Sequence, residues 1–356
     1  MAEKKKYSLL SVLLFGVIVL VVAGLMFCSY LSLIVNPSKL WFFALFGILY
    51  IPLLVLTLIM LLSAARRRSS MAVWLLLALL PAIWLTGRCY QFKGSDKEEG
   101  PLKVVTFNAG LFVHGQKELA GASRLALADS AAAFLRGTGA DIICLQEFGL
   151  PVGVDLTHFL STRFPEYHPE YYVLTGDKGY AGNVTLSRLP VVRKGKIEFE
   201  GSTNMALYTD ISLDTTVIRV YNCHFQSYNL SPDTVIKALG NDEQALSATE
   251  NKMKNSLMRR PGQVEAVLQS MAESPVHSLT VGDFNDTPVS YTYQRLKTGR
   301  KDSFIEAGKG FGATYIKFRP FLRIDYILYP KELEACTYQV PKVRLSDHYP
   351  IIATYR

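Results

Sequence analysis

Polar residues that can bind metal ions or transfer protons follow short apolar segments in the C-terminal two-thirds of this 356-residue chain. In chain order they are Asn108 after VVTF, Glu147 after IICLQ, His224 after VYNC, Asp283 and Asn285 in GDFND, Asp325 in RIDYIL, and Asp347 with His348 in SDHYP. The apolar segments have the composition of buried strands, and strand ends meet at one edge of a sheet. We therefore expect these side chains to meet in a single cleft.

These residue types suit the hydrolysis of phosphate esters. Carboxylate and amide oxygens are hard ligands for Mg²⁺ or Mn²⁺, which also bind the phosphate oxygens of a substrate. Histidines can transfer protons or stabilise charge on a phosphoryl oxygen. The sequence has no glycine-rich phosphate loop followed by Lys, so it gives no support to a P-loop ATPase.

The segments that must position these residues read as many strands and few helices. Strands are predicted at residues 102–107, 142–145, 183–187, 206–213, 217–223, 278–281, 324–328 and 350–354. Helices are predicted at 123–135 and 260–271, and the polar residues 226–259 are expected to form a long loop or a mobile helical hairpin. This pattern predicts an α+β sandwich and not a regular βαβ barrel.

The first 90 residues have a different composition, with apolar segments at 9–35, 40–62 and 71–89. A helix needs about 20 apolar residues to cross a bilayer, and the third segment reaches this length only when residues 86–89 lie at the interface. All three Trp residues of the chain, Trp41, Trp74 and Trp84, fall in this region. We predict three transmembrane helices in residues 1–90, a linker at 91–100, and a catalytic domain at 101–356. A buried helical core is the less favoured alternative.

Basic residues predict the orientation of these helices. Lys4, Lys5 and Lys6 place the N-terminus in the cytoplasm, and residues 66–68 (Arg-Arg-Arg) return to that side. The third helix then exits, so we expect an integral membrane protein with an extracytoplasmic catalytic domain, in the inner membrane if the source is bacterial. Loss of the third helix would reverse this prediction.

Charge and cysteine content exclude little about the substrate. The net charge of +8 fits anionic partners, but part of it comes from the basic residues that flank the membrane segments. The five cysteines are scattered and form no CxxC pair, which argues against a disulfide framework or a zinc site.

The ordered motifs TFN, LQE, NCHF, GDFND, RIDYIL and SDHYP together resemble the endonuclease/exonuclease/phosphatase superfamily. That superfamily includes deoxyribonuclease-I-like nucleases, neutral sphingomyelinases and inositol polyphosphate 5-phosphatases. The resemblance covers nearly all of residues 101–356 and none of the first 90. It implies a four-layered α/β/β/α sandwich and a phosphoesterase that uses Mg²⁺ or Mn²⁺.

The resemblance also implies a role for each motif residue. The implied metal ligands are Glu147, Asn108 and Asp347, and the implied phosphate contacts are Asn108 and Asn183. The implied catalytic residues are Asp283 for the attacking water, Asn285 for a phosphate oxygen, His348 for the scissile phosphate with Asp325 fixing its orientation, and His224 for the transition state.

Structural alternatives exist for several of these residues. His224 could be a core histidine at a strand end, and Asn108 and Asp347 could be turn residues. Asp325 could form an ion pair with Arg323. Asn183 follows Gly in an ordinary turn signal, so the two interpretations of it are about equal.

The motifs leave the substrate open among nucleic acids, phospholipids and small phosphate esters. RIDYIL stands where inositol phosphatases usually carry Cys-Asp-Arg, which disfavours that branch. A sphingomyelinase-like lipid head-group phosphodiesterase gains from the anchor, because a linker of about ten residues extends no more than ~35 Å. A catalytically silent binding module is disfavoured by the intact motifs. The lipid bilayer is an expected partner, and no protein partner is predicted.

Overall fold

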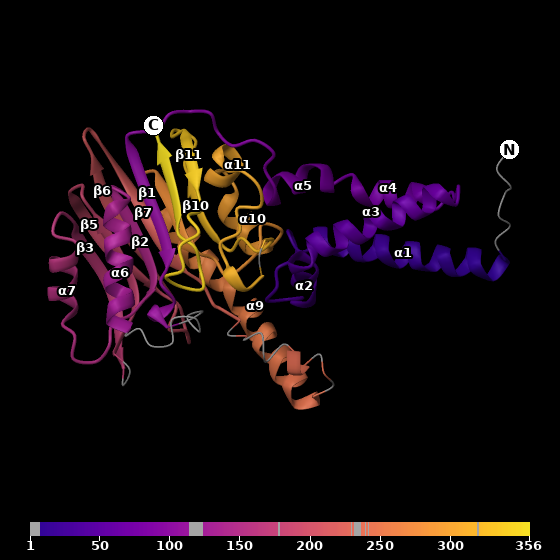
Figure 1. Ribbon diagram of the computed structural model, residues 1–356, viewed down its shortest axis with the longest axis horizontal. Coiled ribbons are helices and arrows are strands. Elements are labelled where there is room, and N and C mark those ends of the chain that lie inside the picture. The colour runs from indigo at the N-terminus through magenta and orange to yellow at the C-terminus, as the bar shows by residue number, and fades with distance from the viewer. Residues whose placement is uncertain are drawn as a thin grey trace.

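The structure is a computed structural model that describes all residues except 1–7, 114–123, 177–178, 229, 231–235, 239, 241 and 319. Figure 1 shows two β-sheets that face each other with helices beside them, and a group of apolar helices that projects to one side. The predicted α+β sandwich is therefore confirmed. The positively charged residues 4–6, used to predict the orientation, lie outside the described residues.

The first sheet carries two of the expected site residues at the ends of its central strands. Its strands in spatial order are β11 (Ala335–Gln339), β12 (Ile351–Tyr355), β1 (Leu102–Asn108), β2 (Ile142–Phe148), β4 (Gly179–Ser187) and β3 (His168–Gly176). The β1 and β2 strands are parallel, so Asn108 and Glu147 reach the same edge of the sheet.

The second sheet carries three more. Its strands in spatial order are β5 (Val191–Glu198), β6 (Met205–Leu213), β7 (Thr216–His224), β8 (Ser278–Asp283), β10 (Asp325–Tyr329) and β9 (Lys301–Asp302). The β7 and β8 strands are parallel and pair His224 with Asp283. The β10 strand is antiparallel to β8, so its first residue, Asp325, pairs with Asp283 at the same edge.

Three apolar clusters hold the layers together. Val104 and Ile142 of the first sheet pack with Val220 and Val281 of the second between the two sheets. The outer face of the first sheet packs on α6 (Arg124–Gly137) and α7 (Leu156–Arg163). The outer face of the second sheet packs on α9 (Glu243–Ala272) and α10 (Tyr291–Lys297). The shorter helices are η1 (Gly110–Phe112), α11 (Ser303–Ala307) and η3 (Ile316–Phe318). This order of layers is α/β/β/α.

The predicted helix start at residue 260 is wrong, because residues 243–259 of the segment expected to form a long loop or a mobile helical hairpin belong to the same helix. The α9 helix begins at Glu243, where the Asp242 side chain accepts a hydrogen bond from the Ala245 amide. Pro261 lies inside this helix and not at its start. The preceding turn is held from outside, because Arg260 Nε donates to the Gln226 carbonyl at 2.7 Å. Such tertiary contacts offset the loss of one backbone hydrogen bond at proline.

Among its described residues, from 8 onward, the apolar N-terminal region contains one helix long enough to cross a membrane, α1 (Leu9–Leu31). The other two predicted spans, 40–62 and 71–89, are not continuous helices. The first is α2 (Phe42–Ile48) and α3 (Tyr50–Arg66), which meet at 70°; the second is α4 (Ala72–Leu79) and α5 (Ala82–Cys89), which meet at 51°. Pro52 lies in the first turn of α3, and Pro81 directly precedes α5. Proline is tolerated at the start of a helix but disrupts a helix that continues through it, which agrees with the two breaks.

The helices of this region run away from the sandwich. In Figure 1 the N-terminal end of α1 and the α3–α4 connection lie far from the sheets, whereas α2 and α5 lie next to them. Arg67, at the far end, stacks over the Phe15 ring at 4.4 Å. The basic residues after α3 and the start of α1 therefore share one end of the bundle, and the sandwich lies at the other.

The predicted linker is packed along the domain and is not a free tether. Gln91 exchanges two backbone hydrogen bonds with Gly310, at 2.9 and 2.8 Å. Lys97 forms an ion pair with Glu334 at 2.6 Å. The Gly100 amide donates to Thr354 Oγ1 at 3.1 Å. The geometric reach of an extended linker therefore does not describe how the domain is held.

A buried polar network joins the two sheets directly beneath the edge that carries the expected site. Asn222, in β7, accepts a 2.7 Å hydrogen bond from Gln146 Nε2 of β2. Its Nδ2 donates to the carbonyls of Leu145 and Val184 at 3.2 and 3.0 Å. Both Asn222 and Gln146 are fully buried. Because each is adjacent or nearly adjacent to a site residue, the network fixes the strand ends across the sandwich.

Replacing Asn222 with Ala is expected to destabilise the sandwich, because Gln146 and two backbone carbonyls lose a partner. Each unsatisfied buried group costs about 1–3 kcal/mol. The free energy of unfolding, measured from urea titrations of far-ultraviolet circular dichroism, should fall by roughly 3 kcal/mol or more. Asn255→Ala, at an exposed position of α9, is the control and should change it by less than about 0.5 kcal/mol. Equal stability of the two variants would contradict the role of the network.

Candidate active site

The Asp283 carboxylate is the centre of the site, at the end of β8. It is 1% exposed, and Oδ2 accepts hydrogen bonds from Asn108 Nδ2 at 2.8 Å and Asn285 Nδ2 at 3.1 Å. Its Oδ1 accepts from the Asn285 backbone amide at 2.8 Å. Asn108 comes from the other sheet, so this carboxylate is bound from both halves of the sandwich.

Local backbone geometry turns the chain sharply here. Gly282 has φ +131, and an added Cβ would lie 2.1 Å from the Cys223 carbonyl oxygen, so only glycine fits beside β7. Asn285 has φ 51 in the left-handed region that asparagine tolerates, and its Nδ2 also donates to the Phe225 carbonyl at 2.9 Å. The GDFN turn is therefore held on the neighbouring strand.

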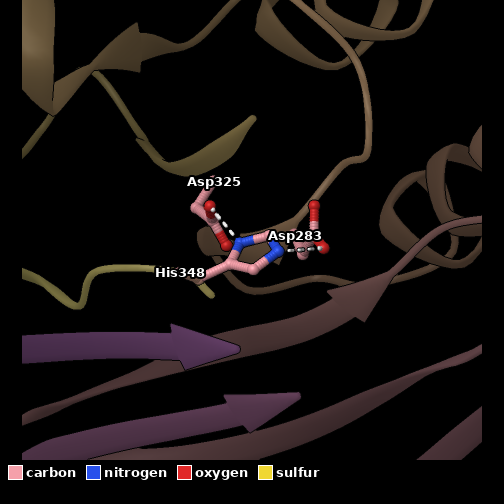
Figure 2. Close-up of side chains that lie close together, drawn as sticks. All are labelled: Asp283, Asp325 and His348. Carbon is pink, nitrogen blue, oxygen red and sulfur yellow. Dashed lines mark hydrogen bonds and ion pairs between the residues drawn. The ribbon is translucent and has the colours of Figure 1, made fainter. Parts of the chain in front are cut away.

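His348 lies between two carboxylates, as Figure 2 shows. Its Nδ1 is 2.9 Å from Asp325 Oδ2, and its Nε2 is 3.9 Å from Asp283 Oδ2. Thr314 Oγ1 accepts the Asp325 backbone amide at 3.2 Å, which fixes the start of β10. Arg323 is paired with Asp302 at 2.9 Å, so the alternative of an Arg323–Asp325 ion pair is wrong.

Glu147 and His224 form the second half of the cluster. His224 Nε2 is 3.3 Å from Glu147 Oε1 and 4.0 Å from Asp283 Oδ2. Asn108 Nδ2 lies 3.4 Å from Glu147 Oε1, so one amide contacts both carboxylates. Asn204 Nδ2 lies 3.1 Å from His224 Nδ1 and fixes the ring from behind. These contacts place His224 in the cluster, against its interpretation as a core histidine alone.

The charges of the cluster shift the pKa values of its members. Burial raises the pKa of Asp283 to about 6, and the charge of Asp325 adds to the rise. Burial disfavours a charged His348, but the Asp325 and Asp283 carboxylates outweigh it and raise its pKa to about 10. Burial acts against both Glu147 and His224 as ions, yet their mutual hydrogen bond and attraction lower the pKa of Glu147 to about 2 and raise that of His224. The site therefore holds a protonated His348 between two carboxylates, and the charge of Glu147 favours the protonated form of His224.

Two residues implied by the resemblance have structural partners of their own. Asn183 is buried between the sheets, and its Nδ2 donates to the carbonyls of Met205 and Asn222 at 3.3 and 3.2 Å. Asp347 is adjacent to His348 in sequence, and its carboxylate forms an ion pair with Lys317 Nζ at 3.0 Å. Neither has a hydrogen bond or ion pair with Glu147 among the contacts of the described residues.

Asn204 and Lys317 contact site residues and were not found by motif. Asn204 lies between two strands, where a polar residue carries no periodic signal, and Lys317 belongs to the short η3 helix. Asn204 also lines a cavity of about 420 Å³ together with Tyr172, Leu174 and Phe199. The cavity therefore lies beside the His224 end of the cluster.

Two sets of residues can be compared as metal ligands. Asp283, Asp325 and His348 have ligand atoms within 4.8 Å of one another, but each His348 nitrogen already faces a carboxylate and its raised pKa favours a protonated ring without a free lone pair. Glu147 keeps a charged carboxylate, and its side chain is 24% exposed. The Glu147 and Asp283 carboxylates with the Asn108 amide supply the hard oxygen donors that Mg²⁺ and Mn²⁺ prefer. The residues present fit such an ion.

Asn108 imposes one condition on that fit. Its Oδ1 accepts a hydrogen bond from the Gly110 amide at 2.9 Å, and its Nδ2 faces the carboxylates. An amide nitrogen does not bind a cation, so direct ligation by Asn108 requires its amide to turn over. As placed, Asn108 orients Asp283 and Glu147.

Comparison with known proteins places this arrangement in a family. The model of the Endonuclease/Exonuclease/phosphatase family matches residues 105–348, which include all the motif residues of the cluster. None of the curated protein sequences gives a significant match to the chain.

Solved structures share the fold of the sandwich. An endonuclease/exonuclease/phosphatase family protein from Leptotrichia buccalis has a TM-score of 0.52 at 15% identity, over 72% of this chain and 99% of its own. An endonuclease/exonuclease/phosphatase from Beutenbergia cavernae has a TM-score of 0.53 at 17% identity, over 72% and 71%. A mannosyl-6-phosphatase from Bacteroides thetaiotaomicron has a TM-score of 0.50 at 16% identity, over 72% and 99%.

Replacing Asp325 with Asn should lower the pKa of His348, because it removes the charge that most favours the imidazolium. In the metal-free protein, nuclear magnetic resonance of labelled histidine should show a decrease of roughly 1–3 pH units from about 10. Since folding raises this pKa, the Asp325–His348 pair stabilises the fold fully below about pH 6.5, and this stabilisation is lost as the pH rises through about 10. Asp214→Asn, at a distant turn, should leave the titration unchanged; an unchanged His348 pKa in Asp325→Asn would contradict this account.

Proposed function

Because this chain belongs to the endonuclease/exonuclease/phosphatase family and is a phosphoesterase, we propose that it is a membrane-anchored, divalent-metal-dependent hydrolase of phosphodiester or phosphomonoester bonds. The observation that carries the proposal is the buried Asp283 carboxylate. Asn108 and Asn285 bind it, and His224 and His348 lie within 4.0 Å of it. A buried carboxylate beside two imidazoles at the open edge of a sandwich suits attack by water on a phosphate.

Glu147 is the proposed principal ligand of Mg²⁺ or Mn²⁺, assisted by Asn108 and, as the resemblance implies, Asp347. When bound, the ion polarises a phosphoryl oxygen and offsets the charge that develops on the phosphate. Before binding, the contact between Glu147 and His224 keeps the carboxylate ionised, which is the form that binds a cation.

Asp283 is the proposed base for the attacking water. Its raised pKa of about 6 leaves it ionised at neutral pH but able to accept a proton. Asn285 lies beside the carboxylate, and its Nδ2 donates to both Asp283 and the Phe225 carbonyl, so it must release one of these hydrogen bonds to hold a phosphate oxygen. The bond from water oxygen to phosphorus forms as the bond to the ester oxygen breaks, and the water proton passes to Asp283. The ester oxygen leaves with the electron pair of the broken bond and takes a proton from solvent to give the alcohol.

The two histidines are proposed to stabilise the phosphoryl oxygens, His348 through its positive charge and His224 through the proton on Nε2. His348 is held as an imidazolium by Asp325, and His224 is held by Asn204 and Glu147. Such groups, fixed before the substrate arrives, stabilise the pentacovalent transition state without reorganisation. The cavity beside Asn204 is the proposed place for the part of the substrate that is not phosphate.

The proposed anchor consists of α1 and the two bent pairs α2–α3 and α4–α5, each counted as one span. The start of α1 and the basic residues 66–68 share the end far from the sandwich, in agreement with a cytoplasmic N-terminus and an extracytoplasmic catalytic domain.

A lipid head-group phosphodiesterase is the second candidate, because the loop that follows Asn285 contacts the anchor. Thr287 Oγ1 is 3.3 Å from the Gly47 carbonyl in α2, at the domain end of the helices. A phosphate held by Asn285 would thus lie near the head groups of the bilayer. The same position would serve a phosphate ester taken up from outside the cell.

Glu147→Gln should reduce kcat/KM of the purified full-length chain by about 100-fold or more, because one ligand charge is lost. Hydrolysis of bis-p-nitrophenyl phosphate with Mg²⁺ or Mn²⁺ measures the effect. Plasmid DNA, RNA, sphingomyelin, phosphoinositides and p-nitrophenyl phosphate then identify the substrate class. Glu250→Gln, at an exposed position of α9, is the matched control. Undiminished activity of Glu147→Gln would refute the metal assignment, and an inactive wild type with every metal and substrate would refute the enzyme.

A reporter enzyme that is active only on the extracytoplasmic side should be active when joined after Arg356. Three membrane crossings from a cytoplasmic N-terminus place the C-terminus on that side. A matched fusion after residue 67 should report the cytoplasm. Activity of the C-terminal fusion on the cytoplasmic side would show that one bent pair does not cross the bilayer.

A further inference from the structure

The segment 286–290, between β8 and α10, is unusually buried for a loop. Loops ordinarily lie at the surface because their polar backbone groups need water. Here Asp286, Thr287, Val289 and Ser290 are each 8% exposed or less. The segment begins directly after Asn285, so whatever covers it also bears on the active site.

The membrane helices cover one side of this loop. Ser32 Oγ, just after α1, shares its proton between the Val289 carbonyl at 2.9 Å and the Ser29 carbonyl at 2.6 Å, and Thr287 donates to Gly47 of α2. The Val289 side chain is 1% exposed and packs in one apolar cluster with Met26 and other residues of the membrane helices. The loop therefore contributes a hydrophobic side chain to the core of the anchor.

Gly47 permits this close approach. A Cβ at this position would lie 2.2 Å from the Val289 carbonyl oxygen and 2.4 Å from Ser32 Oγ. Gly24 and Gly87, also in the membrane helices, have no atom within 4 Å of an added Cβ. The contact between α2 and loop 286–290 thus depends on the absence of a side chain at Gly47.

The other side of the loop is held by the sandwich. Arg260 of α9 is 3.2 Å from Asp286 Oδ2, and the Tyr326 hydroxyl donates to the Asp286 carbonyl at 2.8 Å. Both Arg260 and Asp286 are buried, which makes the pair sensitive to displacement. The loop is therefore clamped between the anchor and the two elements beneath it.

A second link reaches the other catalytic strand. Arg323 Nη2 donates to the Arg88 carbonyl in α5 at 2.8 Å, while Nη1 pairs with Asp302. Arg323 stands two residues before Asp325 and is 1% exposed. The ends of α1, α2 and α5 thus contact chain segments immediately next to Asn285 and Asp325.

We propose that the membrane helices position the catalytic residues, with Gly47 and Ser32 as positioning residues of the active site. The proposal rests on the proposed phosphoesterase function and adds that the anchor is a structural part of the catalytic centre. A displacement of α2 is passed through loop 286–290 to Asn285, and from Asn285 to the Asp283 carboxylate that it binds.

Gly47→Ala in the full-length chain tests this coupling. The added Cβ must push loop 286–290 away from α2, and displacement of catalytic groups by about 1 Å costs about 100-fold in rate. We expect kcat for the substrate identified above, or for bis-p-nitrophenyl phosphate, to fall 10- to 100-fold while KM changes less than threefold. Alanine favours helix more than glycine does, so loss of α2 itself would not account for the fall.

Gly24→Ala and Gly87→Ala are the matched controls and should keep kcat within twofold of wild type. Ser32→Ala removes the hydrogen bond to Val289 without adding bulk and should lower kcat by a smaller factor, about 3- to 10-fold. Hydrogen exchange gives a readout independent of activity: amides of residues 284–290 should exchange faster in Gly47→Ala, and those of β1 and β2 should not.

The outcomes separate the two proposals. If the wild type is active and Gly47→Ala matches it in kcat and in exchange at 284–290, the anchor does not position the site. Faster exchange throughout the sandwich would show general destabilisation and would also overturn the inference. If the wild type cleaves no substrate, the phosphoesterase proposal fails, while the local exchange still decides whether the anchor holds the loop.

Discussion

Burying a carboxylate is costly unless donors surround it, and this requirement organises the catalytic half of the chain. Asp283 meets it with one asparagine from each sheet, so the two sheets must meet at this edge in a single register. The glycine before it lets β8 press against β7, and the left-handed Asn285 returns the chain to the same carboxylate. Two imidazoles, each held by a second partner, then lie against the same group. Much of the site's geometry follows from solvating one charge without water.

The fold beneath the site serves the same requirement. Asn222 stands two residues before His224, and Gln146 stands next to Glu147, so their hydrogen bond ties together the strands that carry a histidine and a carboxylate. Apolar contacts between the sheets tolerate small shifts, because they have no fixed direction. A hydrogen bond between two side-chain amides does not. The polar layer thus aligns what the apolar core only holds together.

Sequence alone predicted the sandwich and the meeting of seven motif residues, because six of them lie at or directly after the end of an apolar strand or begin one, His348 lies shortly before the last strand, and strand ends converge. It could not predict the contact of Asn204 with His224, because a single polar residue in a turn belongs to no periodic sequence pattern. The predicted helix start at residue 260 was wrong because α9 continues through Pro261, where Arg260 and its buried partners hold the preceding turn. The composition of the chain predicted the apolar segments but not the bends within them. The sequence positions of the charged residues could not predict that Arg323 pairs with Asp302, so that Asp325 contacts His348 instead. These outcomes depend on contacts between residues far apart in the chain.

The segment between the apolar helices and the sandwich has backbone and ion-pair contacts along much of its length. A flexible tether would let a domain tumble above a bilayer and sample every approach to its substrate. Here residues 91–100 do not allow free rotation of the domain, since Gln91, Lys97 and Gly100 each form a hydrogen bond or ion pair with it. The position and orientation of the active site relative to the helices are therefore fixed when the chain folds. A substrate therefore meets the active site in a fixed orientation relative to the helices.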